Sequence, residues 1–168
     1  MSNKSVTSSP NSGRMCRPCH TVYIPRNCSG LAAAAGGFCR EFSAQNNVAV
    51  DFRCENIPSN IPPEISLCLF RVLQEALQNA AKYSGVRRFD ASLEGTPNEI
   101  LLAVRDSGIG FNPELTMNGH GLLGLISMRE RMKLVGGQLS IDSRPEHGTI
   151  IHARVPFGPN SVAGPINR

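Results

Sequence analysis

One stretch of the sequence sets the arrangement of the rest: Leu69-Phe70-Arg71-Val72-Leu73-Gln74-Glu75-Ala76-Leu77-Gln78-Asn79-Ala80-Ala81-Lys82. Its apolar residues recur every three or four positions, as on one face of a helix, and its polar residues gather on another face. Pro63 and Glu64 suit the first turn of such a helix, and Gly85 ends it. The pattern predicts an amphipathic helix over residues 64–83 that buries one face in a core.

The segments around this helix alternate between strand and helix patterns. An Ala-rich segment and the segment before Gly136-Gly137 predict helices, over residues 31–42 and 122–135. Period-two alternation predicts a strand at 48–54 and two hairpins, 88–94 with 100–105 and 138–143 with 149–155. Hairpins mixed with helices indicate the α+β class. We expect a two-layer α/β sandwich in which a mixed sheet carries its helices on one face.

Length and composition exclude several classes of protein. The 168 residues are 40% hydrophobic and 18% charged, which is typical of one globular domain. No apolar run approaches 18 residues, so we expect no membrane span. The first 15 residues have no apolar core, and we therefore expect no secretory signal and a cytoplasmic location.

The net charge of +4 comes from a basic leader. Residues 1–29 hold four basic residues and no acidic one, which leaves 13 basic and 13 acidic residues in the remainder. Because the remainder is balanced, we expect no specific nucleic-acid partner, although the leader could bind an acidic surface weakly. The predicted domains are a disordered basic leader at 1–29, a folded domain at 30–156 and a flexible tail at 157–168.

A short cysteine motif lies in the leader: Cys16-Arg17-Pro18-Cys19-His20. Its spacing fits covalent haem attachment and also half of a zinc site. A zinc site needs a second Cys or His pair at short spacing, and Cys28 alone completes it poorly. We therefore expect this motif to bind neither haem nor metal, and we expect Cys54 and Cys68 to be small core residues.

Glycine clusters follow or open three of the predicted elements: Asp106-Ser107-Gly108-Ile109-Gly110, Gly119-His120-Gly121-Leu122-Leu123-Gly124 and Gly148-Thr149. Glycine lets a backbone approach a ligand closely, and a helix that begins in a glycine loop offers free N–H groups to phosphate. The clusters alone fit either a nucleotide site or a set of turns.

The polar face of the long helix adds a second signal. Glu75, Asn79 and Lys82 lie at spacings of four and three, so they project from one stripe. A carboxylate, an amide oxygen and an ammonium group fit a Mg²⁺–phosphate site. A solvated helix face with an ion pair is the alternative.

Together, these motifs and spacings resemble the N, G1, G2 and G3 boxes of the histidine-kinase-like ATPase superfamily. That superfamily includes sensor histidine kinases, gyrase, the 90-kDa heat-shock chaperones and mismatch-repair ATPases. The stretches at 69–82 and 124–131 are similar to bacterial histidine kinases of the nitrate/nitrite-sensor type. The resemblance covers residues 38–156. One departure is Glu146, which stands where the family often has another glycine.

The resemblance implies ATP and Mg²⁺ as cofactors and assigns a role to each box residue. Asn79 would coordinate Mg²⁺, and Glu75 would act as a general base or orient the nucleophile. Asp106 would accept hydrogen bonds from the adenine amino group. The other implied nucleotide-binding residues are Lys82 and Tyr83 at the helix end, Gly108 and Gly110 beside the purine, Gly119, Gly121, Leu122 and Gly124 in the ATP lid, and Thr149 near Asp106.

A complete sensor kinase of this kind also has a helical hairpin that carries a phosphoacceptor histidine. None of the four histidines here lies in such a context: His20, His120, His147 and His152. The resemblance therefore implies transfer of the γ-phosphate of ATP to a histidine on another domain or chain, with a response regulator as a further partner. An anti-sigma-type serine/threonine kinase and a non-catalytic nucleotide-binding regulatory module remain as alternatives.

Overall fold

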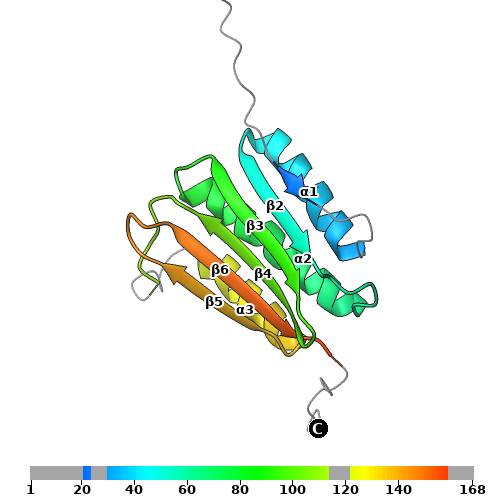
Figure 1. Cartoon of the computed structure of the whole chain (residues 1–168). Coiled ribbons are helices and arrows are strands. Elements are labelled where there is room, and N and C mark those ends of the chain that lie inside the picture. Colours follow the sequence, from blue (N-terminus) through cyan, green and yellow to red (C-terminus); the bar gives the residue numbers. More distant parts are fainter. Residues whose placement is uncertain (1–20, 24–29, 114–121, 159–168) are drawn as a thin grey trace, which may run out of the picture.

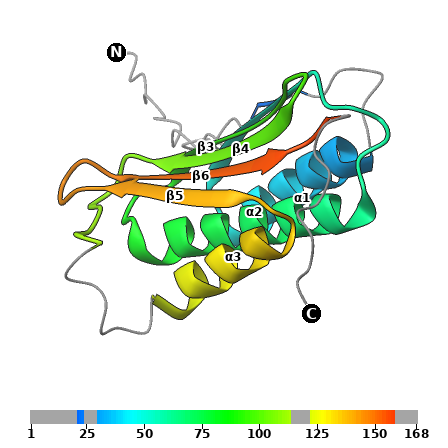
Figure 2. The ribbon, with the colours of Figure 1, turned by 90° about the horizontal axis from the view of Figure 1, so that it is seen from below.

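A mixed sheet with helices on one face forms the described part of the chain (Figures 1 and 2). The computed structural model describes residues 21–23, 30–113 and 122–158. Its elements in chain order are β1 (Val22–Tyr23), α1 (Gly30–Asn46), β2 (Ala49–Glu55), α2 (Pro63–Tyr83), β3 (Arg88–Gly95), β4 (Glu99–Asp106), α3 (Leu122–Leu134), β5 (Gln138–Ser143) and β6 (Thr149–Pro156). The predicted α/β sandwich is confirmed.

The sheet order is β1-β2-β3-β4-β6-β5. β2 runs parallel to β3 because α2 connects them as a crossover, whereas β3 with β4 and β5 with β6 are antiparallel hairpins. The two hairpins join where β4 pairs with β6, and in that register Asp106 lies opposite Thr149. This pairing brings together two predicted site residues that are 43 positions apart (149 − 106).

The core lies between the helical layer and one face of the sheet. In β3 and β4 every second residue is buried, which gives one buried face and one more exposed face. α2 crosses the middle of the sheet, and its predicted apolar face is buried except at Ile65, which is partly buried. The buried members of that face are Leu69, Val72, Leu73, Ala76, Leu77 and Ala80. In Figure 2 all three labelled helices lie below the sheet.

The first helix is longer than its sequence predicted. α1 continues through Gly36 and Gly37 to Asn46, although glycine weakens an isolated helix. Its buried face packs against the core through Ala32, Ala35 and Cys39, and this packing outweighs the low intrinsic propensity.

Residues 21–23 differ from the disorder expected for the leader. β1 pairs in parallel with β2, and the Phe52 N–H donates to the Thr21 carbonyl at 2.8 Å. The Thr21 N–H donates to Asp51 Oδ1 at 3.1 Å, and Arg88 forms a 2.6 Å ion pair with the same carboxylate. The edge of β2 thus holds residues 21–23 through hydrogen bonds that could not be predicted from the sequence of this segment.

Three cysteines in the described residues are buried: Cys39, Cys54 and Cys68. Cys54 and Cys68 are therefore core residues, as predicted. Burial raises the pKa of the Cys39 thiol to about 12, which keeps it protonated. Cys16 and Cys19 lie outside the described residues.

None of the helices in the described ranges is both long and apolar enough to cross a membrane. α2 is the longest at 21 residues, and one of its faces is polar.

Candidate functional site

A cavity of about 320 Å³ opens between α2, the adjoining ends of β4 and β6, and the start of α3. Its volume is in the range of small-molecule binding sites. Most of its wall is apolar, with a few polar side chains. The lining residues are Ala76, Asn79, Ala80, Tyr83, Ser84, Val104, Asp106, Ile109, Gly110, Phe111, Leu125, Thr149 and Ile151.

Asp106 is the acidic group of this cavity. It is the last residue of β4 and is only 6% exposed. Burial raises the pKa of Asp106, and backbone N–H groups of Gly108 and Thr149 oppose that shift by donating to the carboxylate. The bond from Gly108 measures 2.9 Å to Oδ1. A carboxylate held in this way is a fixed hydrogen-bond acceptor at one end of the cavity.

The glycines after Asp106 allow the chain to touch the end of α2. The Ile109 N–H donates to the Ser84 carbonyl at 2.9 Å. A side-chain Cβ at Gly108 would collide with the Ser84 carbonyl oxygen. Gly108 therefore supports the cavity by close approach of two backbones, although it is not among the lining residues.

The β5–β6 hairpin closes the same end of the cavity. The Glu146 N–H donates to the Ile109 carbonyl at 2.6 Å, and a Cβ at Gly110 would collide with the Arg144 carbonyl. Gly148 has φ +77°, and a Cβ there would collide with the carbonyl oxygen of Asp106. Position 148 therefore requires glycine, because any side chain there would clash with the backbone of Asp106.

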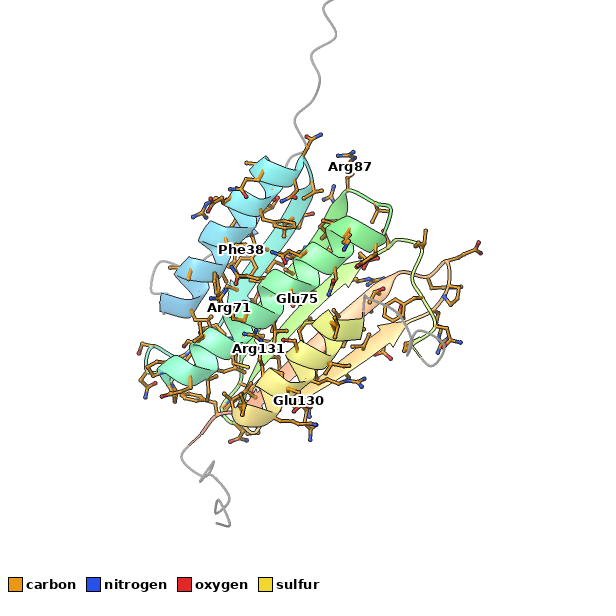
Figure 3. All side chains as sticks on the ribbon, turned by 180° about the vertical axis from the view of Figure 1, so that it is seen from behind. Phe38, Arg71, Glu75, Arg87, Glu130 and Arg131 are labelled. Atoms are coloured by element: carbon orange, nitrogen blue, oxygen red, sulfur yellow. The ribbon has the colours of Figure 1, made fainter. Side chains whose placement is uncertain are left out.

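Glu75 and Asn79 lie together on α2, as the predicted stripe requires (Figure 3, in which Glu75 is labelled). The Asn79 Nδ2 group donates to Glu75 Oε1 at 3.4 Å, and Asn79 also lines the cavity. Gly124 of α3 faces this pair, since a Cβ at Gly124 would collide with Glu75 Oε1 and press on Asn79 Nδ2. The start of α3 therefore rests on the Glu75–Asn79 pair.

Lys82 does not line the cavity. Its ammonium lies 4.9 Å from the centroid of the Tyr83 ring, in cation–π contact, and the side chain is exposed. Tyr83 does line the cavity, so Lys82 lies at its rim, and the phosphate contact that the resemblance implies for Lys82 stays a prediction.

The glycine loop before α3 falls outside the described residues, and with it Gly119 and Gly121. Leu122 begins α3, but the position of its side chain is not described. The described residues hold no cluster of three His, Cys, Asp or Glu side chains that could bind a metal by themselves.

Sequence reasoning missed several residues of this site. Ser84 ends α2 and lines the cavity, and Phe111 and Leu125 supply apolar wall. Ser143 contacts Thr149, a lining residue, at 2.9 Å between hydroxyl oxygens. Phe111 could have been suspected as an apolar residue directly after the glycines. Ser143 carries no such signal, because its partners are set by pairing of the hairpins.

The fold is that of ATPase domains of the histidine-kinase type. The chain belongs to the family of histidine kinase-, DNA gyrase B- and HSP90-like ATPases, whose model matches residues 65–159. This membership confirms the resemblance on which ATP binding was predicted.

Two curated relatives are histidine kinases. The oxygen sensor histidine kinase NreB of Staphylococcus carnosus (strain TM300) is 37% identical over 128 residues, which cover 76% of this chain and 37% of the relative. The signal transduction histidine-protein kinase/phosphatase DegS of Brevibacillus brevis is 30% identical over 128 residues, covering 76% and 33%. The chain thus spans about a third of the length of these relatives.

Solved structures of histidine kinases share the fold. The histidine kinase domain of the blue-light activated histidine kinase from Erythrobacter litoralis EL346 has a TM-score of 0.61 and 19% identity, over 75% of this chain and 64% of that one. Histidine kinase AdeS of Acinetobacter baumannii gives a TM-score of 0.58 and 16% identity, over 75% and 62%. At these identities the likeness concerns the fold alone.

Proposed function

We propose that this chain is the ATP-binding catalytic module of a two-component sensor histidine kinase, which transfers the γ-phosphate of ATP to a histidine on another domain or chain. One observation carries the proposal: a single cavity has a buried carboxylate, Asp106, on its wall and an amide, Asn79, from the polar stripe of α2. The first suits a purine amine and the second suits a metal–phosphate group.

The end of the cavity at Asp106 would bind adenine. The carboxylate accepts hydrogen bonds, and the adenine amino group donates them, whereas guanine presents a carbonyl oxygen at the same edge. The apolar wall would cover the faces of the ring, with Ile109 and Ile151 among its members. Both features favour ATP over GTP.

The Asn79 end fits Mg²⁺ because of the kind of donor it offers. An amide oxygen is a hard ligand, and Mg²⁺ in nucleotide sites is bound by few protein groups, with phosphates and water completing its shell. The lack of a three-residue His, Cys, Asp or Glu cluster among the described residues agrees with that mode. Glu75 accepts a hydrogen bond from Asn79 Nδ2, which leaves Asn79 Oδ1 available to other ligands. When bound, Mg²⁺ would offset the negative charge of the phosphates.

Glu75 would orient the incoming nucleophile or accept its proton. Its carboxylate adjoins Asn79, and its side chain is partly exposed, so a partner's side chain could reach it. General bases act within hydrogen-bond distance of the proton that they remove. Lys82, from the rim beside Tyr83, would reach phosphate only after leaving the Tyr83 ring.

The acceptor histidine would come from outside the described residues. Within them, His147 lies in the β5–β6 turn, where its Nδ1 contacts the Pro145 carbonyl at 2.9 Å, and His152 lies in strand β6. Neither is on a helix that could present it to the cavity. A phosphoacceptor domain acting in trans, a response regulator downstream and a cytoplasmic location complete the proposal.

Radiolabel transfer tests this function. The full chain is incubated with γ-labelled Mg-ATP, with and without a separately produced phosphoacceptor domain from a matching kinase. We expect acid-labile label on the added domain only, and loss of that label with Glu75→Gln while ATP binding persists. Acid-stable label would instead indicate a serine/threonine kinase. ATP binding without label on any matching domain would indicate a regulatory module.

A further inference from the structure

Ser143, at the end of β5, joins the two segments that form the Asp106 end of the cavity. Its hydroxyl receives the Phe111 N–H at 2.9 Å, donates to the Gly148 carbonyl at 3.1 Å and contacts the Thr149 hydroxyl at 2.9 Å. Phe111 belongs to the loop after β4, Gly148 directly precedes β6, and Thr149 is its first residue. Phe111 and Thr149 both line the cavity.

The three contacts fix the direction of one proton. A serine hydroxyl has one hydrogen and two lone pairs. The Phe111 N–H and the Gly148 carbonyl cannot exchange roles, so Ser143 must accept from the first and donate to the second. Its second lone pair is then left for Thr149. Only one arrangement makes all three bonds, and in it Thr149 donates its proton to Ser143.

This arrangement decides what Thr149 offers a ligand. Its backbone N–H is used by the Asp106 carboxylate, and its hydroxyl proton is used by Ser143. The lone pairs of the Thr149 hydroxyl remain for the cavity. Asp106 and Thr149 are partners in the β4–β6 register and both line the cavity, so the two acceptors belong to neighbouring residues of one wall.

We propose that Ser143 is a positioning residue for base selection: it holds the Thr149 hydroxyl as an acceptor, so that Asp106 and Thr149 together select a purine with an amine, and not a carbonyl, at C6. The inference rests on the proposed ATP-binding function and deepens it. A purine with an amine at this edge can donate hydrogen bonds to the two acceptors. A purine with a carbonyl there brings another acceptor, which the two acceptors repel. Ser143 touches no ligand in this scheme and acts through Thr149.

The test compares nucleotide preference among variants of the full chain. Calorimetry gives the affinities of Mg-ATP and Mg-GTP for the unmutated protein, Ser143→Ala, Ser143→Thr and Thr149→Val. Ser140→Ala is the matched control, because Ser140 lies on the same strand with an exposed side chain that is not in the cavity. Urea unfolding of each variant measures stability separately.

We expect Ser143→Ala to lower the ATP-to-GTP affinity ratio roughly three- to tenfold, the size of one lost hydrogen bond. Thr149→Val should lower the ratio by a similar factor, and the double variant should lose no more than either single one, because both remove the same acceptor. Ser143→Thr should restore the ratio, and Ser140→Ala should leave it unchanged.

A nucleotide without the amine provides the decisive comparison. Purine riboside triphosphate has hydrogen where adenine has the amino group, so Ser143→Ala should change its affinity less than twofold. If Ser143→Ala or Thr149→Val weakens ATP, GTP and purine riboside triphosphate equally, Ser143 is only structural and the inference is overturned. Failure of the unmutated protein to bind ATP would overturn the proposed function instead, so the two failures are distinguishable.

Discussion

Replacing Gly148 by alanine tests the close packing beneath Asp106, with Gly136→Ala as its control. Both glycines have a left-handed backbone, with φ +77° at Gly148 and +65° at Gly136. A Cβ at Gly136 meets nothing within 4 Å. A Cβ at Gly148 would collide with the Asp106 carbonyl oxygen and approach Ser107 Cα at 2.8 Å. Comparison of Gly148→Ala with Gly136→Ala therefore separates the cost of the left-handed backbone from the cost of the steric clash.

The magnitudes follow from that difference. Alanine in the left-handed region costs about 1–2 kcal/mol at either position. Overpacking adds about 1–3 kcal/mol when the obstructing atoms cannot move aside, and at Gly148 they belong to the backbone. We expect Gly136→Ala to lower the free energy of unfolding by about 1–2 kcal/mol, and Gly148→Ala by about 2–5 kcal/mol.

Urea unfolding followed by circular dichroism measures both values in one series. The transition should keep its slope, so that the shift in midpoint reports stability. Gly148→Ala should also weaken ATP binding, because Asp106 must move to make room. Equal losses of stability in the two variants, with ATP affinity intact in both, would refute the packing that we describe around Asp106.

Three further predictions concern other parts of the site and core. Gly124→Ala should keep the free energy of unfolding within about 1 kcal/mol, since alanine favours the helix by about that amount and the flexible end of Glu75 can move away. Because Glu75 is displaced, phosphate transfer in the labelling assay should fall roughly 100-fold or more. Asp106→Asn should remove a pH dependence of the free energy of unfolding. Because the pKa of Asp106 is raised in the folded protein, the folded state holds this proton more tightly than the unfolded state. The stability contributed by Asp106 is therefore greatest below pH 3.8 and falls as the pH rises through its raised pKa. Urea unfolding between pH 3 and pH 7 should show this decline in the unmutated protein relative to Asp106→Asn, and parallel curves would contradict it. Cys39, with its pKa raised to about 12, should resist thiol reagents in the folded protein and react in urea, as counted by mass spectrometry; rapid labelling without denaturant would show that it is not buried.

The main elements of the fold could be predicted because their signals are local. Period two in β3 and β4 and the helical stripe of α2 reflect burial of one face, and each is visible within a few residues. β1 could not be predicted in this way. It has two residues, and its bonds depend on the edge of β2 some 30 positions away.

The same difference between local signals and contacts of distant segments applies to the candidate site. Glu75 and Asn79 share a helix turn, so their contact follows from spacing alone. The resemblance places Thr149 near Asp106, and the β4–β6 register explains how the two residues meet. Ser143 was missed because its three bonds all reach across strands and loops. The resemblance assigns a phosphate contact to Lys82, which stays a prediction, and in the structure its ammonium lies against the Tyr83 ring at the rim.

Calorimetry of Mg-ATP and Mg-GTP binding to the full chain tests the central claim most directly. We predict one ATP per chain, bound at least roughly tenfold more tightly than GTP, since the buried Asp106 carboxylate and the half-buried Thr149 hydroxyl both oppose a carbonyl oxygen. EDTA and Asn79→Ala should each weaken ATP binding, with the urea midpoint of Asn79→Ala close to that of the unmutated protein. Equal affinity for the two nucleotides, or ATP binding that is unaffected by both EDTA and Asn79→Ala, would contradict the account.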